Sequence, residues 1–204
     1  MTAPTLYVVI GTAGSGKSTV AQRLARQHGA AYLDKDAMSA RFVEAALAAA
    51  GYDPGDRESN PFYRDRILPL EYDSLLDVAG ANLRLGRPVV LDAPFSPYLS
   101  DPAFIATAAE RFDWPPIDVE VVRVRVSPKT LQDRLRRRGL KRDRVKLAHW
   151  DEYWAVHGGL RCAWTGVRLS EFCNDAQDAE TASHATASAV GFEHAGRNED
   201  GGAR

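Results

Sequence analysis

Cysteine is scarce in this chain of 204 residues, which contains only Cys162 and Cys173. Two cysteines are too few for a scaffold held together by disulfides, and their surroundings lack the second Cys or His pair of a metal site. We therefore interpret both as reduced thiols of an intracellular protein.

Long apolar runs are also absent, and no stretch approaches the roughly 20 residues that a membrane-spanning helix needs. The first residues contain neither a basic region nor a small-residue cleavage site, so we expect no export signal, no membrane contact and a cytoplasmic location. A large excess of positive charge is missing too, because the net charge is −1 and the pI is about 6.5. Nucleic acid is therefore not expected as a partner.

Hydrophobic residues make up 45% of the chain and charged residues 26%, which excludes collagen, coiled coils and global disorder. The composition changes near residue 174. Residues 175–204 contain six acidic and two basic residues and few large apolar groups. We therefore predict a folded domain over residues 1–174 and an acidic tail, rich in Ala, Ser and Gly, that is mostly disordered.

Short apolar runs with β-branched residues alternate with helical patterns along residues 1–174, which predicts an α/β fold with a parallel sheet covered on both faces. Ligands of such sheets bind beyond the carboxyl ends of the strands. The expected strands are Leu6–Ile10, Ala31–Asp34, Pro88–Asp92, Val119–Val126 and Val167–Phe172. The expected helices are Ser18–His28, Ala37–Ala50, Ile67–Leu85, Asp101–Phe112, Pro128–Arg138 and His149–Ala155.

The strongest motif reads Gly-Thr-Ala-Gly-Ser-Gly-Lys-Ser and fits the phosphate-loop (Walker A) pattern G-x-x-x-x-G-K-[ST]. It follows an expected strand and opens an expected helix, so backbone N–H groups and the helix N-terminus can meet phosphate oxygens. Lys17 is expected to reach the β- and γ-phosphates of ATP, and Ser18 to coordinate Mg²⁺. No guanine-selecting Asn-Lys-x-Asp sequence is present. The expected nucleotide-binding residues of this segment are Gly11, Thr12, Ala13, Gly14, Ser15, Gly16, Lys17, Ser18 and Thr19.

Two carboxylates follow at alternate positions, where the second expected strand ends: Asp34 and Asp36. Alternate strand residues project to the same side, so we expect both beside the phosphate loop. One carboxylate can hold Mg²⁺ and its waters, while the other orients and deprotonates an acceptor hydroxyl. The alternative is that Asp36 serves as the N-cap of the helix that follows.

At this point the sequence resembles the P-loop small-molecule kinases, which include shikimate kinase, gluconate kinase and chloramphenicol phosphotransferase. The stretch from Gly11 to Asp36 is similar to gluconate kinase, with Gly-Ser-Gly-Lys-Ser, a helix, and then Ala-Ala-Tyr-Leu-Asp-Lys-Asp. The resemblance implies a three-layer sandwich with a five-stranded parallel sheet of order 2-3-1-4-5. It also implies that Asp34 attends the metal and that Asp36 contacts the acceptor alcohol.

The third expected strand ends in Asp92 and resembles a Walker B strand, whose Asp holds a magnesium-bound water. The resemblance therefore implies that Asp92 contributes to the magnesium site. Asp92 precedes Ala93 and Pro94, so the alternative is a residue that only caps a turn.

Eight arginine and lysine residues crowd into residues 134–146, at the end of the expected Pro128–Arg138 helix and in the segment after it. In nucleoside-monophosphate kinases and their relatives, such a helix ends with two arginines four residues apart and enters a mobile lid. This resemblance implies that Arg134 stacks on adenine, that Arg138 reaches the transferring phosphate and that residues 139–148 form the lid. Arg142 or Arg144 is expected to add a second contact. A nucleic-acid patch and a solvated helix face are the alternatives.

The acceptor site departs from gluconate kinase. A His usually found in those enzymes is replaced by Ser39, and an apolar, aromatic segment follows Asp92 where they have a basic residue. Gluconate and shikimate are therefore not expected as substrates. The remaining aromatic and basic residues suit a sugar, a nucleoside or an aminocyclitol-like natural product. The candidate acceptor-binding residues are Arg41, Arg57, Tyr63, Arg64, Phe95 and Tyr98.

The leading hypothesis is an ATP-dependent phosphotransferase, with Mg²⁺, that moves the γ-phosphate to a hydroxyl of a small molecule. Its expected catalytic residues are Lys17, Asp36 and Arg138, and its expected state is a monomer or homodimer. The alternatives are a polynucleotide 5′-hydroxyl kinase, a nucleotide-sugar kinase, and a regulatory ATPase without an acceptor. Polynucleotide kinases typically place an Arg soon after the second carboxylate, whereas Arg41 lies farther along here.

Overall fold

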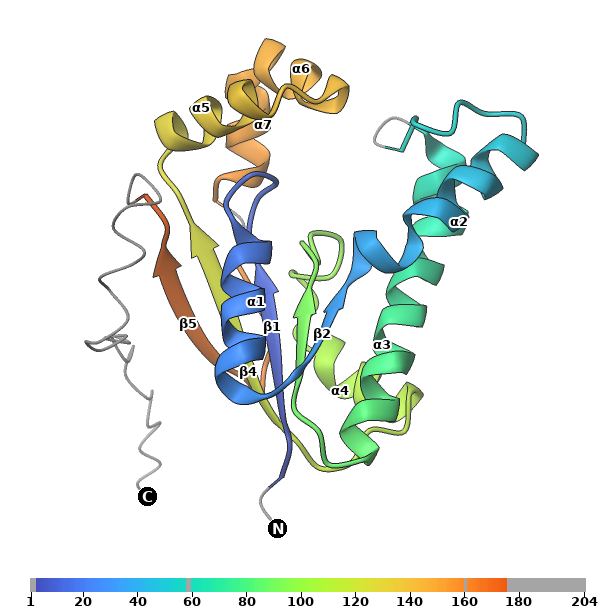
Figure 1. Cartoon of the computed structure of the whole chain (residues 1–204), viewed down its shortest axis with the longest axis vertical. Coiled ribbons are helices and arrows are strands. Elements are labelled where there is room, and N and C mark those ends of the chain that lie inside the picture. Colours follow the sequence, from blue (N-terminus) through green and yellow to red (C-terminus); the bar gives the residue numbers. More distant parts are fainter. Residues whose placement is uncertain (1–2, 58–59, 160, 176–204) are drawn as a thin grey trace, which may run out of the picture.

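The computed structural model describes residues 3–57, 60–159 and 161–175, without the side chains of Lys141 and Arg142. Of the expected disordered tail, residues 176–204 lie outside these ranges, so their disorder stays a prediction. Asp175 is described, and its Oδ1 accepts a hydrogen bond of 2.6 Å from the Ser127 N–H. Five parallel strands form one sheet of order β2-β3-β1-β4-β5, which confirms the expected order (Figure 1). The strands are β1 (Thr5–Ile10), β2 (Ala31–Asp34), β3 (Val89–Asp92), β4 (Asp118–Arg125) and β5 (Arg168–Cys173).

Helices cover both faces of the sheet and also cap its carboxyl-end edge (Figure 1). One face of β1, with Leu6 and Val8, packs against α3 and α4, whereas the other face, with Tyr7 and Val9, packs against α1. None of the described helices is both long and apolar enough to cross a membrane. The helices are α1 (Lys17–His28), α2 (Lys35–Ala49), a π-helix (Tyr63–Ile67), α3 (Leu68–Arg84), α4 (Phe104–Arg111), α5 (Pro128–Arg138), α6 (Lys141–Ala148) and α7 (Trp150–His157).

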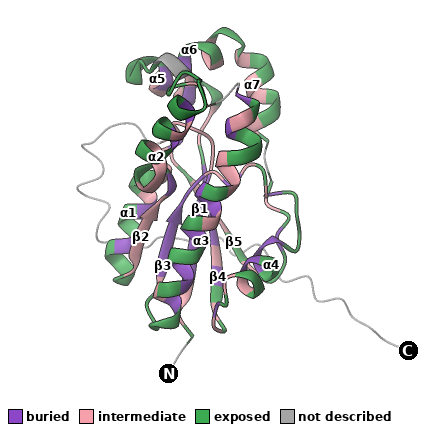
Figure 2. Cartoon of the chain, turned by 90° about the vertical axis from the view of Figure 1, so that its right-hand side faces the viewer, coloured by how far each residue is buried: buried purple, intermediate pink, exposed green. Residues whose placement is uncertain are grey.

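The central strands form the most deeply buried layer, while the outer faces of the helices are exposed (Figure 2). All five strands begin and end within one residue of their expected bounds. The helices differ more. The expected lid segment contains a helix, α6, and a π-helical turn precedes α3. Neither was expected, because short helices of mixed polarity lack a clear apolar period.

Helix α2 begins at Lys35, directly after β2, without an intervening loop. Asp34 ends the strand and caps the helix, because its Oδ1 accepts a hydrogen bond of 3.1 Å from the Ala37 N–H. Asp36 therefore lies in the first helical turn. The expectation that Asp34 and Asp36 project from one side of the strand is wrong, and so is the alternative that Asp36 is the cap.

Phe95 lies in the turn after β3, and its side chain is fully buried. Its ring packs against Tyr72, Phe104 and Trp164, with centroids 5.0, 5.8 and 5.5 Å away. The Phe95 N–H donates a hydrogen bond of 3.0 Å to the Tyr72 hydroxyl. Tyr98 joins the same cluster, with its ring 4.9 Å from those of Tyr72 and Phe104. Phe95 is therefore a core residue, which corrects its expected role as a substrate contact. Tyr98 is half-buried against the same cluster, and its expected role stays a prediction.

We predict that Phe95→Ala lowers the free energy of unfolding by about 3–5 kcal/mol, because the lost ring leaves a cavity in a packed core. The matched control is Phe42→Ala on α2, whose side chain is 77% exposed. That control should change the free energy by no more than about 0.5 kcal/mol. Urea denaturation of both variants measures the difference. Equal effects would contradict the placement of Phe95 in the core.

Candidate active site

The phosphate loop connects β1 to α1, and its glycines adopt conformations that other residues avoid. Gly14 and Gly16 have φ angles of +87° and +90°. A Cβ atom on Gly14 would lie within 3.0 Å of the Leu131 and Leu135 side chains, and one on Gly16 would collide with the Asn174 side chain. The loop is therefore packed tightly against α5 and the end of β5, and glycine is required at both positions.

Arg134 and Asn174 hold the outer side of this loop. The carbonyl oxygen of Ser15 accepts hydrogen bonds from Arg134 Nη1 at 3.0 Å and from Asn174 Nδ2 at 2.7 Å. Arg134 Nη2 also donates to the Asn174 carbonyl at 2.8 Å. Arg134 thus braces the loop from α5, and its stacking on adenine stays a prediction. Sequence reasoning missed Asn174, because it follows the edge strand 159 residues after Ser15.

Lys17 opens α1 and reaches back over the loop, where its Nζ donates a hydrogen bond of 3.1 Å to the Thr12 carbonyl. Burial lowers the pKa of Lys17, while the nearby carboxylates of Asp92, Asp36 and Asp34 act in the opposite direction. The ammonium therefore lies at the centre of the expected site, in the field of all three carboxylates. Burial removes water from this ammonium group, and the phosphate oxygens of a bound ligand would stabilise its charge instead.

Asp34 and Asp92 are direct neighbours in the register of β2 and β3. The Tyr32 hydroxyl lies between them, 2.8 Å from Asp92 Oδ2 and 3.1 Å from Asp34 Oδ2. Burial and these two carboxylates raise the pKa of Tyr32, so its hydroxyl keeps its proton and acts as a donor. The two expected metal residues are therefore brought together by strand pairing, with a tyrosine that sequence reasoning did not single out.

Ser18 lies in the first turn of α1 and lines the same cleft as Asp34 and Asp92. A hydroxyl and two carboxylates are hard oxygen donors, and Mg²⁺ typically takes one or two carboxylates together with substrate phosphates and water. Within the described ranges, no group of three or more His, Cys, Asp and Glu side chains could hold a metal alone. The donor set therefore fits Mg²⁺ that is shared with a nucleotide.

A cleft of about 1160 Å³ opens between the phosphate loop, α2 and the α5–α7 segment. Sixteen of the expected site residues line it, including Asp36, Arg64, Arg134 and Arg138 together with the glycines and Lys17 of the phosphate loop. The cleft volume exceeds the usual range for one drug-sized ligand, so it has room for two ligands. Wall residues from α6 and α7 were not expected: Lys146, His149, Glu152, Tyr153 and His157.

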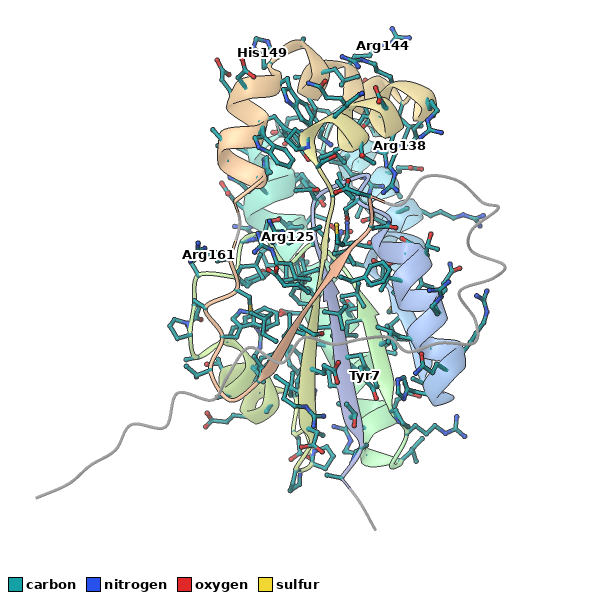
Figure 3. The ribbon with its side chains drawn as sticks, turned by 90° about the vertical axis from the view of Figure 1, so that its left-hand side faces the viewer. Tyr7, Arg125, Arg138, Arg144, His149 and Arg161 are labelled. Atoms are coloured by element: carbon teal, nitrogen blue, oxygen red, sulfur yellow. The ribbon has the colours of Figure 1, made fainter. Side chains whose placement is uncertain are left out.

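Not every expected residue reaches the cleft. Arg41 is exposed on α2 and does not line it. Arg144 points away from the sheet at the outer side of α6 (Figure 3). The side chain of Arg142 is outside the described part of the chain. Arg57 and Tyr63, by contrast, do line the cleft.

Arg138 ends α5 at the rim of the cleft, and its guanidinium forms two hydrogen bonds to Asp143 of α6, at 2.7 and 2.8 Å (Figure 3). The Asp143 carboxylate is buried, whereas the Arg138 side chain is 34% exposed. In this arrangement Arg138 fixes α6 to α5. A contact with a transferring phosphate, as expected from the sequence, stays a prediction.

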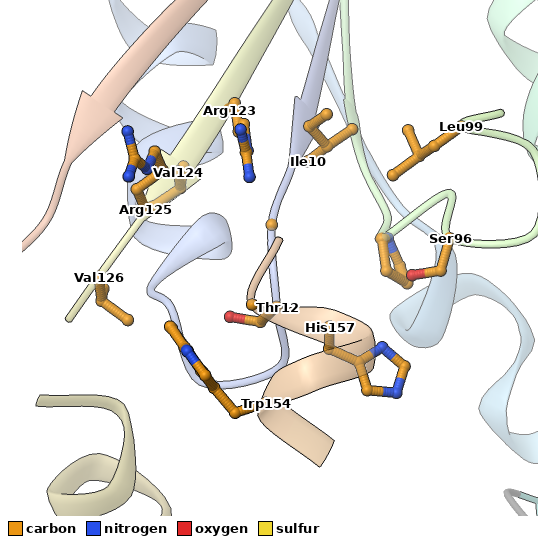
Figure 4. Close-up of a pocket in the computed structure, with 13 residues that line it drawn as sticks. Ile10, Thr12, Ser96, Leu99, Arg123, Val124, Arg125, Val126, Trp154 and His157 are labelled. Carbon is orange, nitrogen blue, oxygen red and sulfur yellow. The ribbon is translucent and has the colours of Figure 1, made fainter. Parts of the chain in front are cut away.

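Helix α7 lies against the back of the phosphate loop. A small cavity of about 60 Å³ remains there, with Thr12 between Trp154 and His157 (Figure 4). Arg123 and Arg125 lie at its other side and form ion pairs with Glu171 of β5, at 3.1 and 2.9 Å. These arginines are therefore occupied by the neighbouring strand, and α7 supports the loop from behind.

Comparison with known proteins agrees with this geometry. Residues 6–160 match the AAA domain family. The chain belongs to this family. A candidate kinase from Chloroflexus aurantiacus is 20% identical over 90% of this chain and 96% of its own, with a TM-score of 0.62. A sugar kinase from Janibacter is 18% identical over 89% and 92%, with a TM-score of 0.55. The fold of this family member is thus the P-loop kinase fold, as the sequence predicted.

A local likeness to cytidylate kinase is also present. The chain is 44% identical to that protein from Mycobacterium avium over 59 residues, which are 29% of this chain and 25% of the relative. The chain thus spans about a quarter of the length of the curated relatives that it matches.

We predict that Lys17→Met abolishes ATP turnover without lowering the stability of the nucleotide-free protein. Burial lowers the pKa of Lys17 in the folded state. As the pH falls below the ordinary lysine pKa, the unfolded chain binds a proton at Lys17 more readily than the folded chain does, so the folded state loses stability. Lys17→Met lacks this loss. The free energy of unfolding of the variant, minus that of the wild type, should therefore be larger at pH 7 than at pH 10. Thermal unfolding and phosphate release measure both effects. Unchanged turnover would contradict the nucleotide site.

Proposed function

We propose that the chain transfers the γ-phosphate of ATP to a hydroxyl group of a small molecule, with Mg²⁺ bound at the strand ends. The observation that supports this proposal most is a single cleft lined by the phosphate loop, the Asp34–Asp92 pair and Asp36. A hydrolytic switch needs the first two of these features. A further carboxylate that is accessible in the same cleft is what transfer to an alcohol requires.

In this proposal the loop N–H groups and Lys17 bind the β- and γ-phosphates, and Arg138 compensates charge on the transferring group. Ser18, Asp34 and Asp92 would hold Mg²⁺, which neutralises charge on the phosphate oxygens when it is bound. Asp36 has a side chain that is 57% exposed in the cleft, so it is accessible to an acceptor hydroxyl. It would orient that hydroxyl and accept its proton.

The acceptor end of the cleft combines aromatic rings with charges of both signs. Tyr63 lines the cleft together with Arg57 and Arg64, which are near it in the sequence, and Tyr153 and Glu152 of α7 line the same cleft. A surface of this kind suits a molecule with several hydroxyls and a ring face, such as a sugar, a nucleoside or an aminocyclitol. The lining does not consist of one charge sign, so a simple polyanion fits it less well.

The local likeness to cytidylate kinase favours a second candidate, transfer to the phosphate of a nucleoside monophosphate. Arg57 and Arg64 are the cleft cations at the acceptor end that could bind such a phosphate. However, Arg57 already donates to the Ala40 carbonyl at 3.0 Å, and Arg64 pairs with Asp65 at 2.8 Å. We therefore rank this candidate below an alcohol acceptor.

The decisive experiment is a screen for ATP-dependent gain of one phosphate. The full chain with Mg²⁺ and ATP is incubated with sugars, nucleosides, aminocyclitols, nucleoside monophosphates and a 5′-hydroxyl oligonucleotide, and products are identified by mass. We expect transfer to one class of small alcohol. Product only from nucleoside monophosphates would establish the second candidate, and product only from the oligonucleotide would establish a polynucleotide kinase. ATP hydrolysis without any phosphorylated product would indicate a regulatory ATPase.

We predict different effects for Asp36→Asn and Asp34→Asn. Asp36→Asn removes the base and should lower kcat by about 10²–10⁴-fold with little change in ATP affinity. Asp34→Asn should raise the Mg²⁺ concentration needed for half-maximal activity, and excess metal should partly restore kcat. Asn caps helices as well as Asp does, so α2 should keep its stability in the second variant.

Steady-state kinetics at several Mg²⁺ concentrations, with the acceptor found by the screen, measure both variants. Full activity of Asp36→Asn would remove it as the base. The same metal dependence in both variants would contradict the division of roles.

A further inference from the structure

Lys35 carries a buried ammonium group between two carboxylates at the acceptor side of the cleft. Its side chain is 5% exposed. Its Nζ lies 3.0 Å from Glu71 Oε1 on α3 and 2.9 Å from Asp36 Oδ1. The ring centroid of Tyr72 is 5.7 Å from the same atom. Lys35 also lines the cleft, so this group belongs neither wholly to the core nor to the surface.

Glu71 is saturated with donors, which fixes the position of the Lys35 ammonium. The Glu71 side chain is only 2% exposed. Besides the Lys35 ammonium, it accepts a hydrogen bond of 2.6 Å from the Tyr63 hydroxyl and one from the Ser39 hydroxyl. A buried carboxylate with three donors has a defined orientation, and its charge balances that of Lys35. The ammonium is therefore held in place independently of Asp36.

The Asp36 carboxylate contacts the Lys35 ammonium at the wall of the cleft. Its side chain is 57% exposed and projects from the first turn of α2. A hydrogen bond to an immobile ammonium favours one rotamer of this side chain. An acceptor base must be held in a defined geometry, because a misplacement of about 1 Å can lower turnover by about 10²-fold.

We infer that Lys35 is a positioning residue for transfer: its ammonium, fixed by Glu71, holds the Asp36 carboxylate in the orientation that receives the acceptor hydroxyl. The inference rests on the proposed function, in which Asp36 is the base. A purely structural ion pair would need only Lys35 and Glu71. A purely structural pair does not explain why Lys35 also contacts Asp36 and lines the cleft.

The simplest variant, Lys35→Met, would leave Glu71 buried without its counter-charge and so endanger folding. The test therefore uses Lys35→Met combined with Glu71→Gln, which removes both charges of the buried pair and keeps the side-chain volumes similar. The matched control is Lys129→Met on α5, where the lysine is exposed and does not line the cleft. Circular dichroism and thermal unfolding establish that each variant is folded.

We predict that the Lys35→Met/Glu71→Gln variant lowers kcat by about 10²-fold, while the KM for ATP stays within about twofold of the wild type. Adding Asp36→Asn should lower kcat by a smaller factor than it does in the wild-type background, because the effects of residues that act as one unit are not additive. Lys129→Met should keep wild-type kinetics. A wild-type kcat in the double variant would overturn the inference. A further loss on adding Asp36→Asn, of the same size as in the wild-type background, would also overturn it.

Chemical rescue separates positioning from packing. Lys35→Cys is prepared with Cys162→Ser and Cys173→Ser, alkylated in denaturant, where position 35 is accessible, and then refolded. 2-Bromoethylamine alkylates position 35 alone and restores the ammonium that balances Glu71, and circular dichroism limits the comparison to preparations that fold. Treatment should recover most of the lost kcat, whereas ethylation with bromoethane, which adds an uncharged group, should not. Equal recovery with both reagents would show that side-chain volume, not charge, matters and would overturn the inference.

Failure of the proposed function is recognised separately. If the wild-type chain phosphorylates no acceptor in the screen, the proposed function falls, and kinetics no longer apply. Crystal structures of the wild type and of the Lys35→Met/Glu71→Gln variant then decide the positioning claim. A single Asp36 rotamer in the wild type and a different or divided one in the variant would support it. The same single rotamer in both would overturn it.

Discussion

The register of three neighbouring parallel strands determines where all the chemistry of this protein can occur. β3 pairs with β2 so that Asp92 lies beside Asp34, and it pairs with β1 so that Asp92 also lies beside Val9. The phosphate loop leaves β1 two residues after Val9. Because parallel strands end at one edge, the loop and both carboxylates meet there without any long-range adjustment of side chains. A shift by one residue would turn each of these groups to the other face.

Around this edge, the protein concentrates charges that are only partly balanced within the chain. Glu171 forms ion pairs with both Arg123 and Arg125, which leaves one positive charge over, and Asp143 pairs with Arg138. Lys17 differs, because burial dominates its environment and lowers its pKa despite three nearby carboxylates. A bound polyphosphate would supply negative charge to Lys17, and its metal ion would supply positive charge to the carboxylates. The electrostatics thus favour the same ligand as the loop geometry.

Local signals in the sequence were sufficient for the five strands and the phosphate loop, because buried apolar runs and a glycine pattern depend on neighbouring residues alone. The order of the strands in the sheet came from the resemblance to the P-loop kinases. The carboxylate pair was harder. Asp34 and Asp36 are two residues apart in either geometry, and only the capping hydrogen bond to Ala37 decides that the helix starts between them. Asn174 could not be found from the sequence, since its contact with Ser15 joins opposite ends of the domain.

The turn after β3 shows a different kind of error, in which residues expected at the site pack against the core instead. Phe95 and Tyr98 follow a strand that ends at the site, so a ligand contact was a reasonable expectation. The structure turns these rings into the cluster of Tyr72 and Phe104 instead. Burial of a large ring depends on which helices cover that face of the sheet, and no local pattern records this. For the same reason, the buried Lys35–Glu71 pair looks in the sequence like two ordinary helix residues.

The central claim is that the strand ends and the phosphate loop form one binding site for a nucleotide and its metal ion. Hydrogen–deuterium exchange, with and without a non-hydrolysable ATP analogue and Mg²⁺, tests it most directly. The account predicts slower exchange over residues 11–19 with the analogue, and additional slowing over residues 34–37 and 92–93 that requires Mg²⁺. Protection confined to other parts of the chain, or protection of the strand ends that is independent of Mg²⁺, would contradict it.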